Sequence, residues 1–427
     1  MSSRVDLDLG PATSPRAARR RQGVVAQLEH LFPAGDVDLT LRYGPVPAGS
    51  QPVAQWRVVP GPADPQFLLP VRPAAARRVL TSHNRLRGPK VRALRRGAAL
   101  AVGPLAAALG ERAVLRLTAP AGVLPAELDA AVITRHLLST VPGAVSTAIS
   151  LRSFSARAKP TVQLLDAAGH VLAFAKVSSD GATGARVQRE AQLLHAIGER
   201  CSGTVRLPRV LATGRCGPHA YSVVEPLPHR ARGLRPGDEA TAMAGLARLQ
   251  AAFGSPSATV GSTALWRELR DRAAAATRDL DHPVAAALDR LVAAVETRDG
   301  ALELATGAFH GDWVPWNLAT ANGTLWVWDL EYGSEQAPVG LDALRWVFQV
   351  EHVLRGATTA AALDAARAAA PRLLPPLGAD PAHTPTLLRL HLVEFVTTGL
   401  ELLAAGRGLP HGVDAGTPAI MDRLAAA

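Results

Sequence analysis

The chain has 427 residues, of which 48% are hydrophobic, so it is too long for one ordinary single-core domain and too apolar for bulk disorder. It contains no apolar run of the roughly 18 residues that a membrane span needs, and no signal-peptide core at its N-terminus. Its two cysteines, Cys201 and Cys216, exclude a disulfide framework, so we predict a soluble, cytoplasmic protein with two or three modules.

The net charge of +10 is concentrated in the first part of the chain. Residues 1–120 contain 18 Lys and Arg against 7 Asp and Glu, a balance of +11, which leaves −1 for residues 121–427. The most basic segment is Arg77–Arg96, which could face the phosphates of a membrane surface or a nucleic acid. It lacks interleaved aromatic residues, so we favour a solvated helix face, expect no nucleic-acid partner, and keep weak membrane-surface association open.

Residues 1–120 predict an extra N-terminal α/β module, rich in proline and in short extended runs. These runs are Leu39–Tyr43, Gln55–Val59 and Phe67–Val71. Their order does not predict how they pair. A helix is then predicted over Glu127–Val141, where apolar residues recur close to a 3.6-residue period.

Residues 121–225 predict a small antiparallel lobe. Three strands follow one another, with a helix and two further strands behind them. The predicted strands are Ala148–Arg152, Thr161–Leu165, Val171–Val177, Arg209–Ala212 and Ala220–Val224, and the helix is Ala185–Ile197.

Residues 226–427 predict a mainly helical lobe. Its first long helices are expected over Glu239–Ala252, Trp266–Leu280 and Val284–Thr297. The exception is the segment Gly307–Gly333, where turn residues separate two short strand-like pieces and the polar motifs of the chain gather.

That segment contains the motif His-Gly-Asp-Trp-Val-Pro-Trp-Asn, which runs from His310 to Asn317, and twelve residues later comes Asp329. Phosphoryl transfer from ATP needs a carboxylate that orients the attacking hydroxyl and accepts its proton, and oxygen ligands for magnesium. Asp312 suits the first need, while Asn317 and Asp329 suit the second. Asp312 and Asn317 can lie at opposite ends of one short loop and point into the same cleft.

A complementary pair lies upstream in the order that such chemistry needs. Lys176 is near the end of a predicted buried strand, where a lysine needs an anionic partner. Glu190 follows fourteen residues later on the next predicted helix. A lysine held by a helix carboxylate can reach the α- and β-phosphates of a nucleotide.

With these motifs, residues 145–350 resemble the aminoglycoside phosphotransferase and choline kinase family, whose fold is similar to that of the protein kinases. The resemblance implies an α+β fold of two lobes, a small antiparallel N-lobe and a helical C-lobe. The His-Gly-Asp form of the loop favours small-molecule kinases over protein kinases.

The resemblance also implies roles for single residues, with ATP and Mg²⁺ as the cofactors. His310 would brace the loop and Asp342 would be structural. Asp312 would be the catalytic base, Asn317 and Asp329 the magnesium ligands, Lys176 the phosphate-binding lysine and Glu190 its partner.

Two nucleotide contacts are less clearly marked. The run Glu225-Pro226-Leu227 resembles the linker that holds adenine, where Glu225 would offer its carbonyl and Leu227 its amide, since proline has no N–H. The segment Arg152–Pro160 stands where protein kinases have a glycine-rich loop, yet it has no glycine. It could contact phosphate or be a basic turn, and both interpretations stay open.

The helical half has no dense acidic run for a polycationic aminoglycoside, so a sugar, amino sugar or related metabolite is the favoured hydroxyl acceptor. Trp313, Trp316 and Trp328 could stack on a sugar, but we favour core packing for them. Two alternatives remain. One is a pseudokinase that binds nucleotide without transfer, and the other is a membrane-surface kinase that acts on a glycolipid or polymer precursor.

Overall fold

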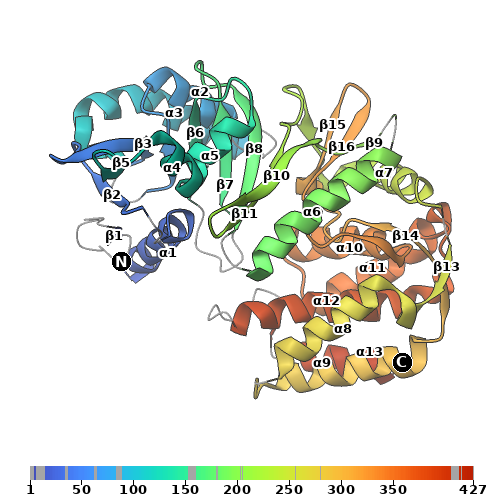
Figure 1. The fold of residues 1–427 in the computed structure, drawn as a ribbon. Coiled ribbons are helices and arrows are strands. Elements are labelled where there is room, and N and C mark those ends of the chain that lie inside the picture. Colours follow the sequence, from blue (N-terminus) through green and yellow to red (C-terminus); the bar gives the residue numbers. More distant parts are fainter. Residues whose placement is uncertain are drawn as a thin grey trace. The chain divides into compact units, whose positions relative to one another are not determined.

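The computed structural model describes most of the chain (Figure 1). The described residues are 4–5, 15–33, 37–61, 65–82, 89–151, 160–178, 181–201, 203, 205–254, 256–278, 280–404, 413–414 and 416–426. They form two compact units, Met1–Gln192 with Pro208–Pro228, and Leu193–Leu207 with His229–Ala427.

The first unit is built on one ten-stranded sheet, in the order β1-β2-β5-β3-β4-β6-β7-β8-β11-β10. Its neighbouring strands pair antiparallel, except for the parallel pair β1 and β2. The strands are β1 (Arg4–Val5), β2 (Thr40–Tyr43), β3 (Ser50–Val59), β4 (Phe67–Leu69), β5 (Val114–Pro120), β6 (Ser146–Ser150), β7 (Thr161–Leu165), β8 (Val171–Ser178), β10 (Val210–Cys216) and β11 (His219–Val224). The predicted meander is confirmed as β6-β7-β8.

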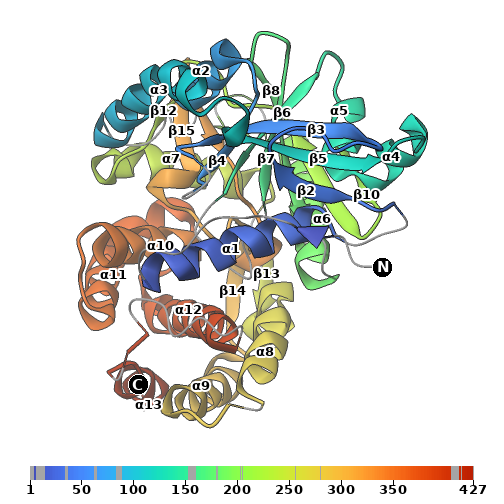
Figure 2. The same cartoon turned by 90° about the vertical axis from the view of Figure 1, so that its left-hand side faces the viewer.

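The helices of this unit include an unpredicted N-terminal one. They are α1 (Pro15–Leu31), α2 (Pro73–Ser82), α3 (Pro89–Leu109), α4 (Pro125–Ala131), α5 (Ile133–Thr140) and the first part of α6 (Gly181–Arg200). Helices α2 and α3 lie side by side (Figure 2). The single helix predicted over Glu127–Val141 was wrong, because Val132 has the extended angles φ −108° and ψ 103° and separates α4 from α5.

The sheet continues across residue 120, where the sequence predicts a domain boundary. Strand β5 lies between β2 and β3, while β4 pairs with β6 from the following segment. The main apolar core likewise joins residues from Val24 on α1 to Val223 on β11. The divisions at residues 120 and 225 stay predictions about how the chain folds. The sheet continues across residue 120, whereas its last strand along the chain, β11, ends at Val224.

The second unit is predominantly helical. Its helices are the rest of α6, α7 (Glu239–Ala251), α8 (Ala264–Thr277), α9 (Pro283–Ala294), α10 (Leu341–Gln349), α11 (Thr359–Leu373), α12 (Thr384–Ala404) and α13 (Thr417–Ala426). Since the first unit rests on an antiparallel sheet and the second on helices, the predicted α+β class is confirmed. Within the described ranges, no helix combines the length and apolar character that a membrane crossing requires.

Two small sheets of the second unit position the polar motifs. One has the order β12-β15-β16-β9, from β12 (Arg232–Gly233), β15 (Leu318–Ala321), β16 (Thr324–Val327) and β9 (Val205–Arg206). The other has the order β13-β14-β17, from β13 (Ser257–Thr259), β14 (Glu303–Phe309) and β17 (Ser334–Pro338). Asn322 and Gly323, with φ 50° and 77°, form the two-residue turn of the β15–β16 hairpin.

Candidate active site

The loop His310–Asn317 joins the buried end of β14 to the start of β15. Gly311 has φ +79°, and a Cβ added there would lie 2.4 Å from the carbonyl oxygen of Tyr332. The backbone therefore passes too close to the 332 peptide for any side chain. This contact is the physical reason for glycine in the motif.

His310 braces the loop through both ring nitrogens, as the resemblance implies. Its Nδ1 accepts a hydrogen bond from the backbone N–H of Asp312 at 3.1 Å, so its Nε2–H donates to the carbonyl oxygen of Trp328 at 2.9 Å. The imidazole is completely buried. One neutral tautomer thus links the loop that carries Asp312 to the residue that precedes Asp329.

Asp342, at the start of α10, holds the same loop from the other side. Its Oδ2 accepts from the N–H of His310 at 2.7 Å and its Oδ1 from the N–H of Gly311 at 3.1 Å. Burial raises the pKa of Asp342 to about 7, against the opposing effects of these hydrogen bonds and of Arg345. The carboxylate is fully occupied with the backbone, which suits a structural role.

Asp312 and Asn317 meet across the loop, as their spacing predicts. The Nδ2 group of Asn317 donates to Asp312 Oδ2 at 2.7 Å and to the Asp312 carbonyl oxygen at 3.0 Å. Asn317 is buried, and its backbone N–H donates to Val314 within the short 3₁₀ turn Pro315–Asn317. The amide therefore fixes the direction of the Asp312 carboxylate.

Asp329 follows β16 in a left-handed backbone conformation, with φ +71°. Such a φ is uncommon for a residue with a side chain and is found most often for Asn and Asp. The next residue, Leu330, is completely buried. The turn thus ends β16, with the side chain of Asp329 partly buried and that of Leu330 fully buried.

Electrostatics link these two aspartates. Burial raises the pKa of Asp312 to about 6, Arg345 lowers it, and the charge of Asp329 raises it. Two carboxylates carry the same negative charge and repel each other, so a divalent cation bound beside them is favourable. Asn317 and Asp329 supply the oxygen atoms that Mg²⁺ prefers, so the residues present fit this metal.

The upstream pair is formed within the first unit. Lys176 on β8 donates to both carboxylate oxygens of Glu190 on α6, at 2.6 and 2.7 Å. The glutamate is only 3% exposed, while the lysine side chain is 25% exposed. Strand β8 buries Ala173, Ala175 and Val177 in the core, so alternation puts Lys176 on the opposite face of the sheet.

The run Glu225-Pro226-Leu227, which resembles a linker that holds adenine, directly follows β11. The side chain of Glu225 accepts from the backbone N–H of Arg209 at 3.1 Å, and the backbone N–H of Glu225 donates to the Arg209 carbonyl at 3.0 Å. The nucleotide roles of Glu225 and Leu227 stay predictions. Residues 152–159 of the glycine-free loop lie outside the described residues.

Arg345 is a feature of the site that the sequence did not predict. It is 7% exposed on α10, forms an ion pair with Glu394 of α12, and lies 5.9 Å from the ring centroid of Phe309. Its charge lowers the pKa values of both Asp312 and Asp342. In the sequence, the indication of this role was an arginine among the apolar residues of α10, because a buried arginine needs a charged partner.

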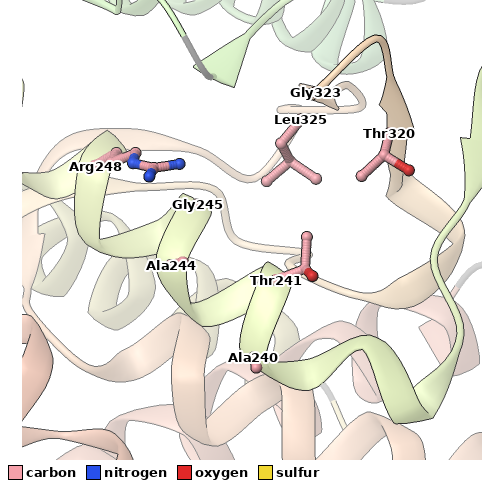
Figure 3. A pocket seen from close by; sticks show the side chains of 8 residues that line it. All are labelled: Ala240, Thr241, Ala244, Gly245, Arg248, Thr320, Gly323 and Leu325. Atoms are coloured by element: carbon pink, nitrogen blue, oxygen red, sulfur yellow. The ribbon is translucent and has the colours of Figure 1, made fainter.

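A cavity of about 360 Å³ lies between α7 and the β15–β16 hairpin (Figure 3). It is lined by Ala240, Thr241, Ala244, Gly245, Arg248, Thr320, Gly323 and Leu325. A Cβ at Gly245 would be 2.1 Å from Leu325 Cδ2, so helix and hairpin touch directly there. None of the predicted site residues lines this cavity.

Comparison with known families gives the segment that contains these motifs an identity. Residues 150–332 match the phosphotransferase enzyme family. The predicted resemblance is confirmed for this segment, which makes up less than half of the chain. The matched range includes Lys176, Glu190 and the whole segment from His310 to Asp329.

Solved structures of phosphotransferases are similar to the chain at low sequence identity. Aminoglycoside phosphotransferase APH(4)-Ia is 14% identical, with a TM-score of 0.45, over 69% of this chain and 97% of its own. Amicoumacin kinase hAmiN is 11% identical, with a TM-score of 0.38, over 63% and 84%. The GDP complex of aminoglycoside 2'-phosphotransferase-IIIa is 13% identical, with a TM-score of 0.40, over 63% and 88%. No curated protein matches the chain.

Proposed function

We propose that this phosphotransferase moves the γ-phosphate of ATP to a hydroxyl group of a small molecule. The observation that carries the proposal is the bracing of Asp312, whose carboxylate is directed by Asn317 at 2.7 Å while His310 and Asp342 hold the loop backbone. A fixed carboxylate can orient an attacking hydroxyl and accept its proton as the phosphorus–oxygen bond forms.

Residues of both units would hold the nucleotide. Lys176, oriented by Glu190, would bind the α- and β-phosphates, and Asn317 with Asp329 would bind Mg²⁺, which neutralises charge on the transferred group when it is bound. Glu225 and Leu227 would hold adenine through their backbone groups. In this proposal Asp312 alone handles the proton.

We propose a sugar, an amino sugar or a related metabolite as the acceptor. The helical half has no dense acidic run of the kind that a polycationic aminoglycoside would need, and residues 121–427 are nearly neutral overall. Trp313 is completely buried and serves the core. Trp316 is partly exposed next to Asn317, so it is available for a sugar face.

The first test is thermal stabilisation by ATP with and without Mg²⁺, in wild type and Asp329→Ala. Asp364→Ala is the matched control, because its carboxylate is exposed on α11. We expect stabilisation that needs Mg²⁺ and is lost in Asp329→Ala but not in Asp364→Ala. If millimolar nucleotide gives no shift, the nucleotide site is refuted.

A transfer assay with a panel of hydroxyl acceptors then separates a kinase from a pseudokinase. Nucleotide binding with no turnover on any acceptor, water included, would support the non-catalytic alternative. The second candidate, a membrane-surface kinase acting on a glycolipid or polymer precursor, is favoured by the exposed apolar face of α3 beside basic residues. Turnover that requires the acceptor to be presented in vesicles would support it.

A further inference from the structure

Helix α3 has an apolar face that nothing covers within the described residues. Residues 97–109 contain no charged or polar side chain, and a helix that is apolar on all sides is ordinarily buried. Only one side is buried, through Ala99 and Val102, which pack with α2 and β4. On the other side Leu94 is 73% and Leu100 78% exposed. Gly97, Pro104, Ala107 and Ala108 are exposed as well.

Cationic side chains border this face. Arg96 is exposed on α3. Gly103 lies seven residues further along the same helix, and the guanidinium of Arg77, from α2, lies directly against it. Positions seven apart lie on the same side of a helix, so both charges border one edge of the apolar face. Arg95 stacks over Phe67 at 4.1 Å and holds this end of the helix to the sheet.

The surrounding chain carries no opposing charge in its sequence. Residues 65–110 include nine arginine or lysine residues and neither aspartate nor glutamate. The absence of acidic residues over this length keeps the edge of the face strongly positive at neutral pH. A partner must therefore offer apolar contacts and negative charge at the same time.

We propose that α3, with the α2 arginine beside it, docks on the surface of an anionic lipid membrane. A helix with an apolar face and a cationic edge lies in the plane of the membrane interface, with leucines among the acyl chains and arginines at the phosphates. Nucleic acid fits less well, since it offers no apolar layer for Leu94 and Leu100. This inference does not depend on phosphoryl transfer.

The test is flotation of the full-length protein with vesicles of phosphatidylcholine, with or without about 30% phosphatidylglycerol. We expect binding to the anionic vesicles only, and release between about 50 mM and about 500 mM NaCl. Soluble glycerol phosphate at millimolar concentration should not compete, because it lacks the acyl layer. Competition by it would show a simple phosphate site and overturn the proposal.

Substitutions on α3 test whether this face is the part of the protein that binds the vesicles. Leu94→Asp and Leu100→Asp should each weaken vesicle binding at least about tenfold, since each removes a buried leucine from the acyl layer. Arg96→Gln should weaken it about fivefold on anionic vesicles. Leu124→Asp is the matched control, because Leu124 is 62% exposed before α4 and lies outside the face. It should bind as wild type.

The outcomes decide the proposal in either direction. The four substituted side chains are all exposed, so unchanged circular dichroism and thermal midpoints are expected and exclude misfolding as the cause. No vesicle binding at low salt would overturn the proposal, and so would binding that survives both leucine substitutions. Self-association that Leu100→Asp abolishes, without vesicle binding, would assign the face to a second copy instead.

Discussion

Gly311 shows how one residue fixes the geometry of the loop. Its positive φ disfavours a side chain, and the Tyr332 carbonyl oxygen lies too close to the place that a Cβ would occupy. We expect Gly311→Ala to destabilise the fold by roughly 3 kcal/mol or more and to reduce activity, measured by urea denaturation and turnover.

The matched control is Gly323→Ala in the hairpin turn. Gly323 has nearly the same φ, +77°, but no atom lies within 4 Å of an added Cβ. We expect a loss of only about 1 kcal/mol, from the backbone conformation alone. Equal losses at both positions would show that the contact with Tyr332 is unimportant.

Asp312 is the residue on which the proposed chemistry depends. Asp312→Asn keeps the shape and a partner for Asn317 but removes the proton acceptor, so we expect transfer to fall by about 100- to 10,000-fold. Nucleotide binding should survive, because it rests on Lys176 and the metal. Isothermal titration and a transfer assay measure the two effects separately, and wild-type turnover would refute the role of the base.

At the scale of elements, the ion pair of Lys176 with Glu190 joins β8 to α6. Lys176→Met would remove the ammonium group that contacts the buried carboxylate of Glu190, which costs roughly 3 kcal/mol. We expect the double variant Lys176→Met with Glu190→Leu to recover much of that stability while nucleotide binding stays lost. If the double variant is no more stable than Lys176→Met, the buried charge is not the source of the loss.

The junction of α1 with β11 should respond to acid. His219 is completely buried and lies 6.3 Å from the ring of His30 on α1. Burial lowers the pKa of His219 to about 4, and His30 and Arg215 lower it further. The unfolded chain takes up this proton near pH 6.5, whereas the folded chain does so only near pH 4. The contribution of the neutral His219 to the free energy of unfolding is therefore complete above pH 6.5 and is lost as the pH falls toward 4.

We therefore expect His219→Gln to flatten the decline of unfolding free energy between pH 6.5 and 4, by at most about 3 kcal/mol. His195→Gln, whose ring is 71% exposed, should leave the decline unchanged. Equilibrium unfolding at a series of pH values measures both. An unaltered slope in His219→Gln would place the acid sensitivity elsewhere.

At the scale of the whole molecule, the sheet joins the N-terminal segment to the rest of the first unit. Removal of residues 1–120 would take away β1 to β5 and part of the apolar core, and would leave β6 as an open edge. We expect the truncated chain 121–427 to aggregate or to lack a cooperative transition, as seen by size-exclusion chromatography and calorimetry. A soluble, cooperatively folded truncation would support a domain boundary at residue 120.

The sequence alone determined the elements whose patterns are local. The meander β6-β7-β8, helices α7 to α9 and the β15–β16 hairpin followed from short-range periodicity and turn residues. The pairing of Asp312 with Asn317 followed from a spacing of five residues within one loop. Such features need no knowledge of distant contacts.

Only the tertiary structure decided the features that join distant parts of the chain. The bond from His310 to Trp328, the hold of Asp342 on the loop and the burial of Arg345 depend on packing between elements. The pairing of β4 with β6 likewise spans about eighty residues and has no local pattern. Periodicity shows which face of an element is buried, but the partner that covers that face is chosen by the whole fold.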